Sequence, residues 1–91
     1  MDSGTYRRAT NILDAGIGED LVALNVDRGD CYGFNSVAAT VWRDLDTPKS
    51  FDQLRQTLMS EYDVTYDQCT SDLQDLLEDL VGKGLVKFDG P

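Results

Sequence analysis

The chain contains no histidine, only two cysteines and two prolines, and no long apolar run. Histidine is the commonest general base and the usual partner of a nucleophilic serine or cysteine, so its absence disfavours both kinds of catalysis. Two widely separated cysteines without histidine do not make a zinc site. We therefore expect a protein that is not an enzyme and that holds neither a metal nor a cofactor.

Positive charge is also scarce, because 8 Lys and Arg stand against 17 Asp and Glu, a net charge of −9. Such a chain repels phosphate, which disfavours nucleic acid and anionic membranes as partners. No segment reaches the ~18 apolar residues of a spanning helix. The polar start, Met1 to Arg8, also lacks the apolar stretch of a signal peptide. We expect a cytoplasmic protein in which Cys31 and Cys69 stay reduced.

The length of 91 residues predicts a single domain, residues 1–91, with a core over about 9–88. The first third of this domain has strand character. We expect strands near 9–14, from Leu21 to Val26 and from Asp30 to Phe34. The glycines and acids of 14–20 predict a turn between the first two strands, and a glycine at position 29 suits the hairpin before the third. These strands predict an antiparallel sheet.

The remainder of the chain has helical character, beginning where the apolar period changes from two to about 3.6 at Asn35. Asn35 can cap the first helix, which Pro48 prevents from continuing. Ser50 with Gln53, and Thr65 three residues before a glutamine, have the spacing of capping boxes. The sequence therefore predicts three helices after the sheet.

The apolar positions of these segments predict a core. We expect it to contain Tyr32, Phe34, Val41, Trp42, Leu73 and Leu77. The stripe predicted for the third helix comprises Cys69, Leu73, Leu76, Leu77, Leu80 and Val81. A short apolar tail, Leu85 to Phe88, should pack back on this core, where it could form a further strand.

Turn, aromatic and helix signals follow one another in an order that resembles the PqqD-like peptide chaperones, over roughly residues 20 to 88. The residues that carry the resemblance are Gly29, Tyr32, Phe34, Asn35, Trp42, Leu45, Asp46, Pro48, Phe51, Leu54, Leu58, Tyr62, Asp63, Gly84, Leu85 and Val86. The resemblance implies a winged-helix-like α+β fold with an N-terminal three-stranded antiparallel sheet followed by three helices. It also implies non-catalytic binding of the leader segment of a ribosomally made, modified precursor peptide.

The third helix separates peptide binding from DNA binding, the other function of winged-helix-like folds. Its polar surface carries five acids and no base before Lys83. These acids are Asp67, Asp72, Asp75, Glu78 and Asp79. DNA binding depends on neutralising phosphates, so this helix opposes it.

A strand at a sheet edge can accept an extended peptide through its unpaired backbone groups. We expect Asp30 to Phe34 to be that strand and the third helix to form the other wall of a groove, with an apolar floor and an acidic rim. The predicted contact residues are Asp30, Cys31, Tyr32, Gly33, Phe34, Cys69, Asp72, Leu73, Asp75, Leu76, Asp79 and Leu80. The alternative is that Leu76 belongs to the core and the acids form a solvated face.

The partners implied by the resemblance are a precursor peptide and a separate modifying enzyme. That enzyme is either a radical-SAM protein or a leader peptidase and cyclase of the lasso-peptide type, and no residue of this chain distinguishes the two. A different class of function also stays open. The chain could be an acidic protein-interaction or regulatory module with no role in leader binding.

Overall fold

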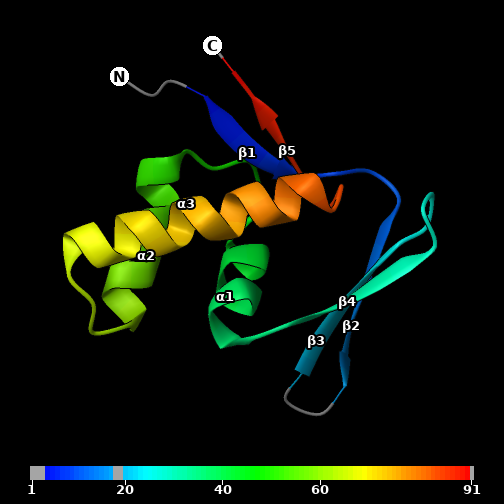
Figure 1. Cartoon of the computed structure of the whole chain (residues 1–91), viewed down its shortest axis with the longest axis horizontal. Helices are drawn as coiled ribbons and strands as arrows, with labels where there is room; N and C mark the ends of the chain where they lie inside the picture. Colours follow the sequence, from blue (N-terminus) through cyan, green and yellow to red (C-terminus); the bar gives the residue numbers. More distant parts are fainter. Residues whose placement is uncertain (1–3, 18–19, 91) are drawn as a thin grey trace.

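The computed structural model describes residues 4–17 and 20–90 of the chain (Figure 1). The strands in these ranges are β1 (Thr5–Arg8), β2 (Ile12–Ile17), β3 (Asp20–Asn25), β4 (Asp30–Phe34) and β5 (Val86–Asp89). The helices are α1 (Ser36–Asp44), α2 (Phe51–Glu61) and α3 (Tyr66–Gly82). No helix in the described part of the chain is long and apolar enough to cross a membrane.

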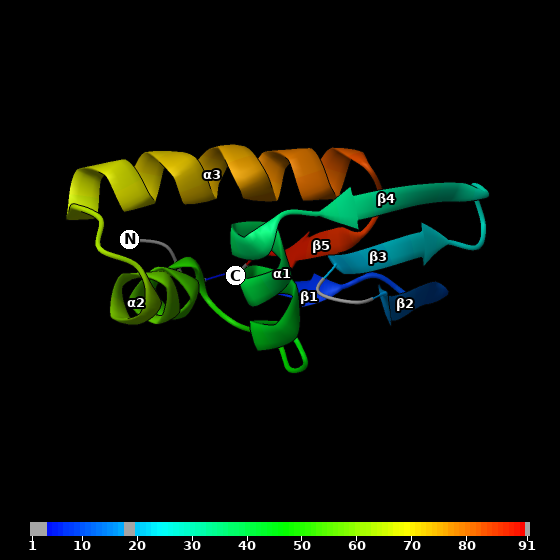
Figure 2. The same ribbon diagram turned by 90° about the horizontal axis from the view of Figure 1, so that it is seen from below.

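The strands form two antiparallel sheets, one with the order β2-β3-β4 and a second made of β1 and β5. The predicted α+β fold with a three-stranded sheet followed by three helices is confirmed, whereas the winged-helix likeness is not. Figures 1 and 2 show the three-stranded sheet projecting to one side of the helices, and β1 and β5 running together toward the chain ends. The predicted apolar tail is thus β5, anchored by the buried Leu85 and Val86.

The predicted boundaries at the N-terminus need correction. The first predicted strand, 9–14, lies instead at Ile12–Ile17, and the segment from Asp14 to Ile17 is strand and not turn. Gly18 and Glu19, which belonged to the predicted turn, lie outside the described residues. The reason is tertiary: β2 pairs residue by residue with β3, from Ile12 opposite Asn25 to Ile17 opposite Asp20, and ladder bonds outweigh local turn preference.

The helix caps agree with the sequence. The Asn35 side chain accepts a hydrogen bond from the Ala38 backbone N–H at 2.8 Å. Ser50 and Gln53 form a full capping box, in which each side chain accepts from the other residue's backbone N–H. Thr65 accepts from the N–H three residues on, at 3.2 Å. Each side chain satisfies a backbone donor that the first helical turn leaves free.

The core contains most of the residues predicted for it. Four of the six are at most 1% exposed, namely Val41, Trp42, Leu73 and Leu77. Tyr32 and Phe34 are half-buried and pack against that core. The prediction that Val81 belongs to the buried stripe of this helix was wrong, because Val81 is 40% exposed. Cys31 and Cys69 are both free thiols, the first exposed and the second buried.

Trp42 makes contacts with three strands from its place on α1. Its indole N–H donates to the Asp14 carboxylate of β2 at 2.8 Å. The Arg8 guanidinium of β1 lies 4.5 Å from the ring centroid and donates to the Trp42 carbonyl at 2.6 Å. The Phe34 ring of β4 lies 5.5 Å away, tilted by 52°. One side chain therefore ties α1 to both sheets.

Replacement of Trp42 by alanine should lower the free energy of unfolding by about 3 to 5 kcal/mol, because it removes a fully buried aromatic side chain and leaves a cavity. Urea denaturation followed by circular dichroism measures the change. The matched control is Arg43→Ala, the neighbouring exposed position on the same helix, which should change stability by less than about 0.5 kcal/mol. Equal losses of stability in the two variants would show that Trp42 does not belong to the core.

Candidate functional site

Strand β4 is an edge of the three-stranded sheet. It pairs with β3 on one side, from Leu21 opposite Phe34 to Asn25 opposite Asp30, and is the last strand in the sheet order. Beyond its other side lies α3, and the Lys83 ammonium at the end of that helix is 5.0 Å from the Tyr32 ring centroid. Figure 2 shows the end of β4 that leads into α1 lying next to the last turn of α3, while the rest of the strand extends beyond the helix. The edge of β4 is therefore open, and the C-terminal end of α3 lies near its central residue.

Side chains alternate along β4. Tyr32 and Phe34 point inward and are half-buried, whereas Cys31 and Gly33 are exposed. A Cβ built at Gly33 would meet no atom within 4 Å, so the space beside it is open. Asp30 is exposed and accepts a hydrogen bond from the Tyr32 hydroxyl at 3.3 Å. Among the described residues, no strand pairs with the side of β4 that faces away from β3.

The flank of α3 that was predicted to form the second wall of the groove carries residues three or four positions apart, which places them on one side of the helix. These residues are Cys69, Asp72, Leu76, Asp79 and Lys83. Leu76, in the middle, is partly buried and packs against the core. Leu73 and Leu80, also predicted to contact a peptide, are only 1% exposed and offer no surface to one in this structure. They form the core behind the flank.

An apolar pocket lies at the N-terminal end of the flank. Its lining comes from α1, α2, α3 and the α2–α3 connection, and comprises Val37, Leu58, Tyr62, Val64, Cys69 and Asp72. The cavity measures about 50 Å³. A single water needs ~10–15 Å³ on the same kind of measure, so the pocket has room for the end of an aliphatic side chain.

Most residues of this pocket were not predicted as contact residues. Cys69 and Asp72 were named, but Val37, Leu58, Tyr62 and Val64 were not. Val37 and Tyr62 were visible only as members of helical apolar patterns, and Val64 stood alone in a connection. They meet because three helices converge there, which no local pattern indicates.

The Cys69 thiol acts as a small apolar group in the pocket. Burial raises the pKa of Cys69 more than the nearby Arg55 cation lowers it, and Asp72 adds to the rise. The thiol lies 3.9 Å from the Arg55 carbonyl, to which it can donate a weak bond. A neutral thiol is a poor nucleophile, so the arrangement suits packing and does not favour covalent chemistry.

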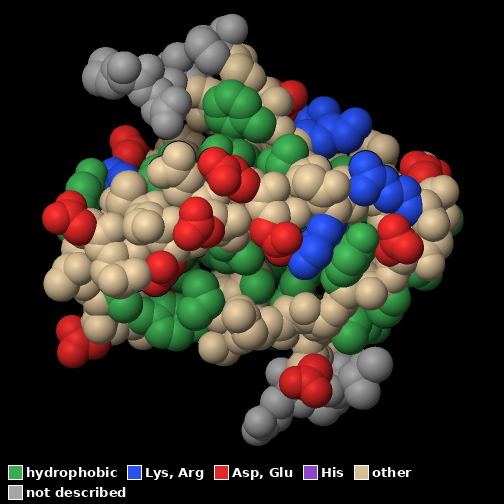
Figure 3. Space-filling view, in the orientation of Figure 1, with side chains coloured by type: hydrophobic (Ala, Val, Ile, Leu, Met, Phe, Trp, Pro, Cys, Tyr) green, Lys and Arg blue, Asp and Glu red, His purple; other side chains and the backbone are tan. Residues whose placement is uncertain are grey.

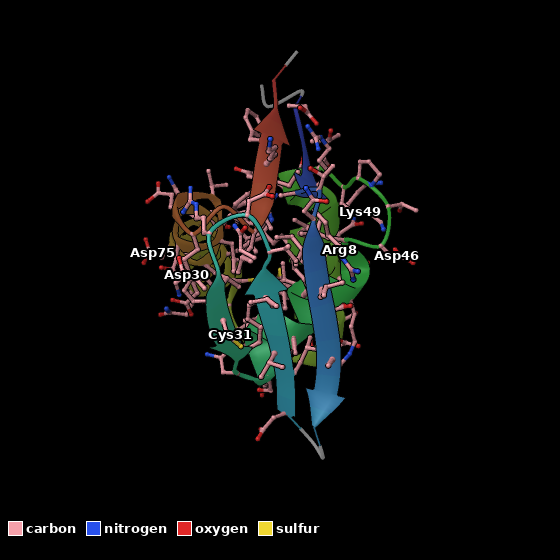
Figure 4. The ribbon with its side chains drawn as sticks, turned by 90° about the vertical axis from the view of Figure 1, so that its right-hand side faces the viewer. Arg8, Asp30, Cys31, Asp46, Lys49 and Asp75 are labelled. Carbon is pink, nitrogen blue, oxygen red and sulfur yellow. The ribbon has the colours of Figure 1, made fainter. Side chains whose placement is uncertain are left out.

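The three acids predicted to line the rim, Asp72, Asp75 and Asp79, are all exposed but differ in their partners. Asp79 forms an ion pair with Lys83 at 2.8 Å, and Asp72 accepts from the neutral Gln68 amide at 2.8 Å. Within the described residues, Asp75 has no side-chain partner. Figure 3 shows acidic side chains over α3 beside a line of hydrophobic ones, and Figure 4 places Asp75 on the same side as Asp30. The uncompensated negative charge of the rim thus lies at Asp72 and Asp75.

Comparison with known proteins gives one family and two similar structures. The family model for coenzyme PQQ synthesis protein D (PqqD) matches residues 20–86. In sequence, no curated protein matches the chain.

Both similar structures are complexes. The first, TbiB1 in complex with the TbiA(beta) leader peptide, is 25% identical, with 89% of this chain and 94% of that chain covered at a TM-score of 0.83. The second, lasso peptide synthetase B1 complexed with the leader peptide, is 26% identical, with 90% and 96% covered at a TM-score of 0.79. Each therefore shares nearly the whole fold with this chain.

Proposed function

Since this chain belongs to the PqqD family, we propose that it binds the leader segment of a ribosomally synthesised precursor peptide and catalyses no reaction itself. The main support is that the two similar structures, which share nearly the whole fold, are both leader-peptide complexes. The open edge of β4 beside α3 supplies a suitable site. We further propose that residues 1–91 act as one peptide-recognition domain in the cytoplasm.

The proposed mode of binding is addition of the leader as a further strand on β4. In an antiparallel ladder, alternate residues direct both backbone groups to the partner strand and the others direct them away. The hairpin closes tightly, with the Gly29 N–H donating to the Asn25 carbonyl at 2.7 Å and Asn25 opposite Asp30. We propose that Cys31 and Gly33, which alternate with the half-buried Tyr32 and Phe34, present their N–H and C=O groups to the leader.

Backbone pairing alone does not account for useful affinity. Four hydrogen bonds at about 1 kcal/mol net each give about 4 kcal/mol, before the leader is ordered. Micromolar binding requires about 8 kcal/mol. Apolar side chains of the leader must therefore be buried as well, and the pocket beside Cys69 and the partly buried Leu76 are the surfaces available along the groove.

We propose that the bound leader is presented to a separate modifying enzyme. The similarity to lasso peptide synthetase B1 favours a leader peptidase and cyclase of the lasso-peptide type. The family's association with coenzyme PQQ synthesis keeps a radical-SAM protein as the other class. Reconstitution of leader cleavage or of radical modification, with and without this chain, distinguishes these partners.

Substitution of Gly33 tests strand addition. Gly33→Pro removes a backbone donor and should abolish binding of a synthetic leader in isothermal titration while the fold is retained, because no side chain crowds the position. The matched control is Gly33→Ala, which adds a Cβ in open space, keeps the N–H and should bind within about twofold of wild type. Unaltered affinity in a folded proline variant, or leader-induced amide shifts that spare residues 30–34, would exclude strand addition here.

Truncation of Leu76 tests the apolar wall of the groove. Leu76→Ala should weaken leader binding by about 1 to 3 kcal/mol while backbone pairing to β4 persists, since only side-chain burial is lost. Amide shifts on β4 should therefore still appear at saturating leader. Val81→Ala, an exposed aliphatic change on the other flank of α3, is the control and should leave affinity unchanged. If the two variants bind alike, Leu76 belongs to the core alone.

Neutralisation of the rim tests the acidic flank. The combined change of Asp72, Asp75 and Asp79 to asparagine should slow leader association and flatten its salt dependence, because rim charges act mainly on encounter. Most of that effect should come from Asp72 and Asp75, since Asp79 is already paired with Lys83. Stopped-flow association rates at several salt concentrations measure it. Identical association rates for the triple variant and wild type would show that the acids form a solvated face with no part in leader binding.

A further inference from the structure

The hairpin between β3 and β4 is fastened to the C-terminal end of α3. Asn25 is the buried polar residue of the described chain, at 5% exposed, and its amide donates to the carbonyls of Gly84 at 3.3 Å and Lys83 at 3.5 Å. Arg28, in the hairpin loop, donates to the Gly82 carbonyl at 3.2 Å. Asn25 also accepts from the Arg28 N–H at 3.2 Å, which joins the two contacts. We call Asn25 and Arg28 the hairpin clamp.

The clamp also explains the glycine that follows α3. Gly84 has φ of +74°, and a Cβ there would lie 2.9 Å from the Asn25 amide nitrogen and 3.0 Å from the Arg28 guanidinium carbon. The clamp residues therefore approach the helix terminus closely. Their donors satisfy carbonyls that the end of a helix leaves without intrahelical partners.

We infer that Asn25 and Arg28 are positioning residues that set the distance between β4 and α3, and so hold the groove ready for a leader. This inference rests on the proposed function. At its C-terminal end β4 is fixed by the direct passage through Asn35 into α1. At the other end the hairpin loop, residues 26–29, is exposed and projects from the body of the protein (Figure 1). The clamp bonds, together with the Lys83 ammonium over the Tyr32 ring, hold this end against α3.

Loss of the clamp should slow the association of the leader. Without the clamp the hairpin end of β4 occupies a range of positions, of which a fraction matches the spacing that a leader must span. The apparent dissociation constant rises as that fraction falls, so a competent fraction of about 10 to 30% corresponds to about 3- to 10-fold weaker binding. Because the clamp residues do not touch the leader, the loss should lie in the association rate, and the complex should dissociate as before.

The experiment compares Asn25→Ala and Arg28→Ala with a matched control. The control is Lys49→Ala, which removes a comparable tie, the 2.7 Å bond from the Lys49 ammonium to the Asp44 carbonyl, on the other side of the molecule from Asp30 and Asp75 (Figure 4). The probe is a fluorescent peptide selected from a random display library on the wild-type chain. Stopped-flow mixing gives both rate constants, and urea denaturation gives the stability of each variant.

A structural readout needs no peptide. In wild type the Lys83 side chain lies over the Tyr32 ring, so its terminal methylene protons should be shifted upfield by the ring current. Loss of the clamp should reduce that shift in both clamp variants and leave it intact in Lys49→Ala. A shift retained in both clamp variants overturns the inference, because the groove would then keep its width unaided.

The binding outcomes separate the two levels of the proposal. About 3- to 10-fold slower association with unchanged dissociation in the clamp variants, and neither change in the control, supports the inference. Faster dissociation alone means direct contact with the peptide and overturns it, as do unchanged rates. If no selected peptide shifts the amides of β4 in wild type, the proposed function fails and the inference with it. Arg28 is exposed, so its variant should fold even where Asn25→Ala does not.

Discussion

Burial of Trp42 is the interaction on which the rest of the structure depends. The indole is 1% exposed and contacts Arg8 of β1, Asp14 of β2 and Phe34 of β4 from its position on α1. Truncation of one buried aromatic side chain costs about 3 to 5 kcal/mol, which is a large share of the net stability of about 5 to 15 kcal/mol that a small domain has. The polar partners matter as much, since a buried indole N–H without an acceptor would be costly. This one residue therefore links α1 to both sheets.

The same arrangement leaves β4 as an open edge. Because β4 passes through Asn35 directly into α1, the strand cannot turn its edge away from α3 without moving Trp42. An open edge normally invites aggregation, and natural proteins protect such edges. Here the edge is short, lies beside a helix and is accompanied by a strongly acidic surface, features that restrict what can pair with it. An extended peptide that brings apolar side chains satisfies these restrictions, whereas a second acidic domain does not.

Particular elements show how far local reasoning reached. The caps at Asn35, Ser50 and Thr65 were predictable because a cap depends on residues three positions apart. Strand β1 was not, because Thr5–Arg8 pairs with β5, the strand from Val86 to Asp89, at the other end of the chain. Val81 was misplaced because the helical period alone makes the buried stripe too wide. The actual stripe is limited by where α2 and β5 contact α3.

The sequence by itself determined the α+β class, the three helices with their starts, the core around Trp42 and the acidic flank of α3, because each depends on local periodicity or on net charge. Tertiary structure decided the second sheet, the pocket where Val37, Tyr62, Val64 and Cys69 meet, and the clamp from Asn25 to the end of α3. These features join segments that are far apart in the chain. Their formation depends on the shape left after the core has packed, which no window of the sequence contains.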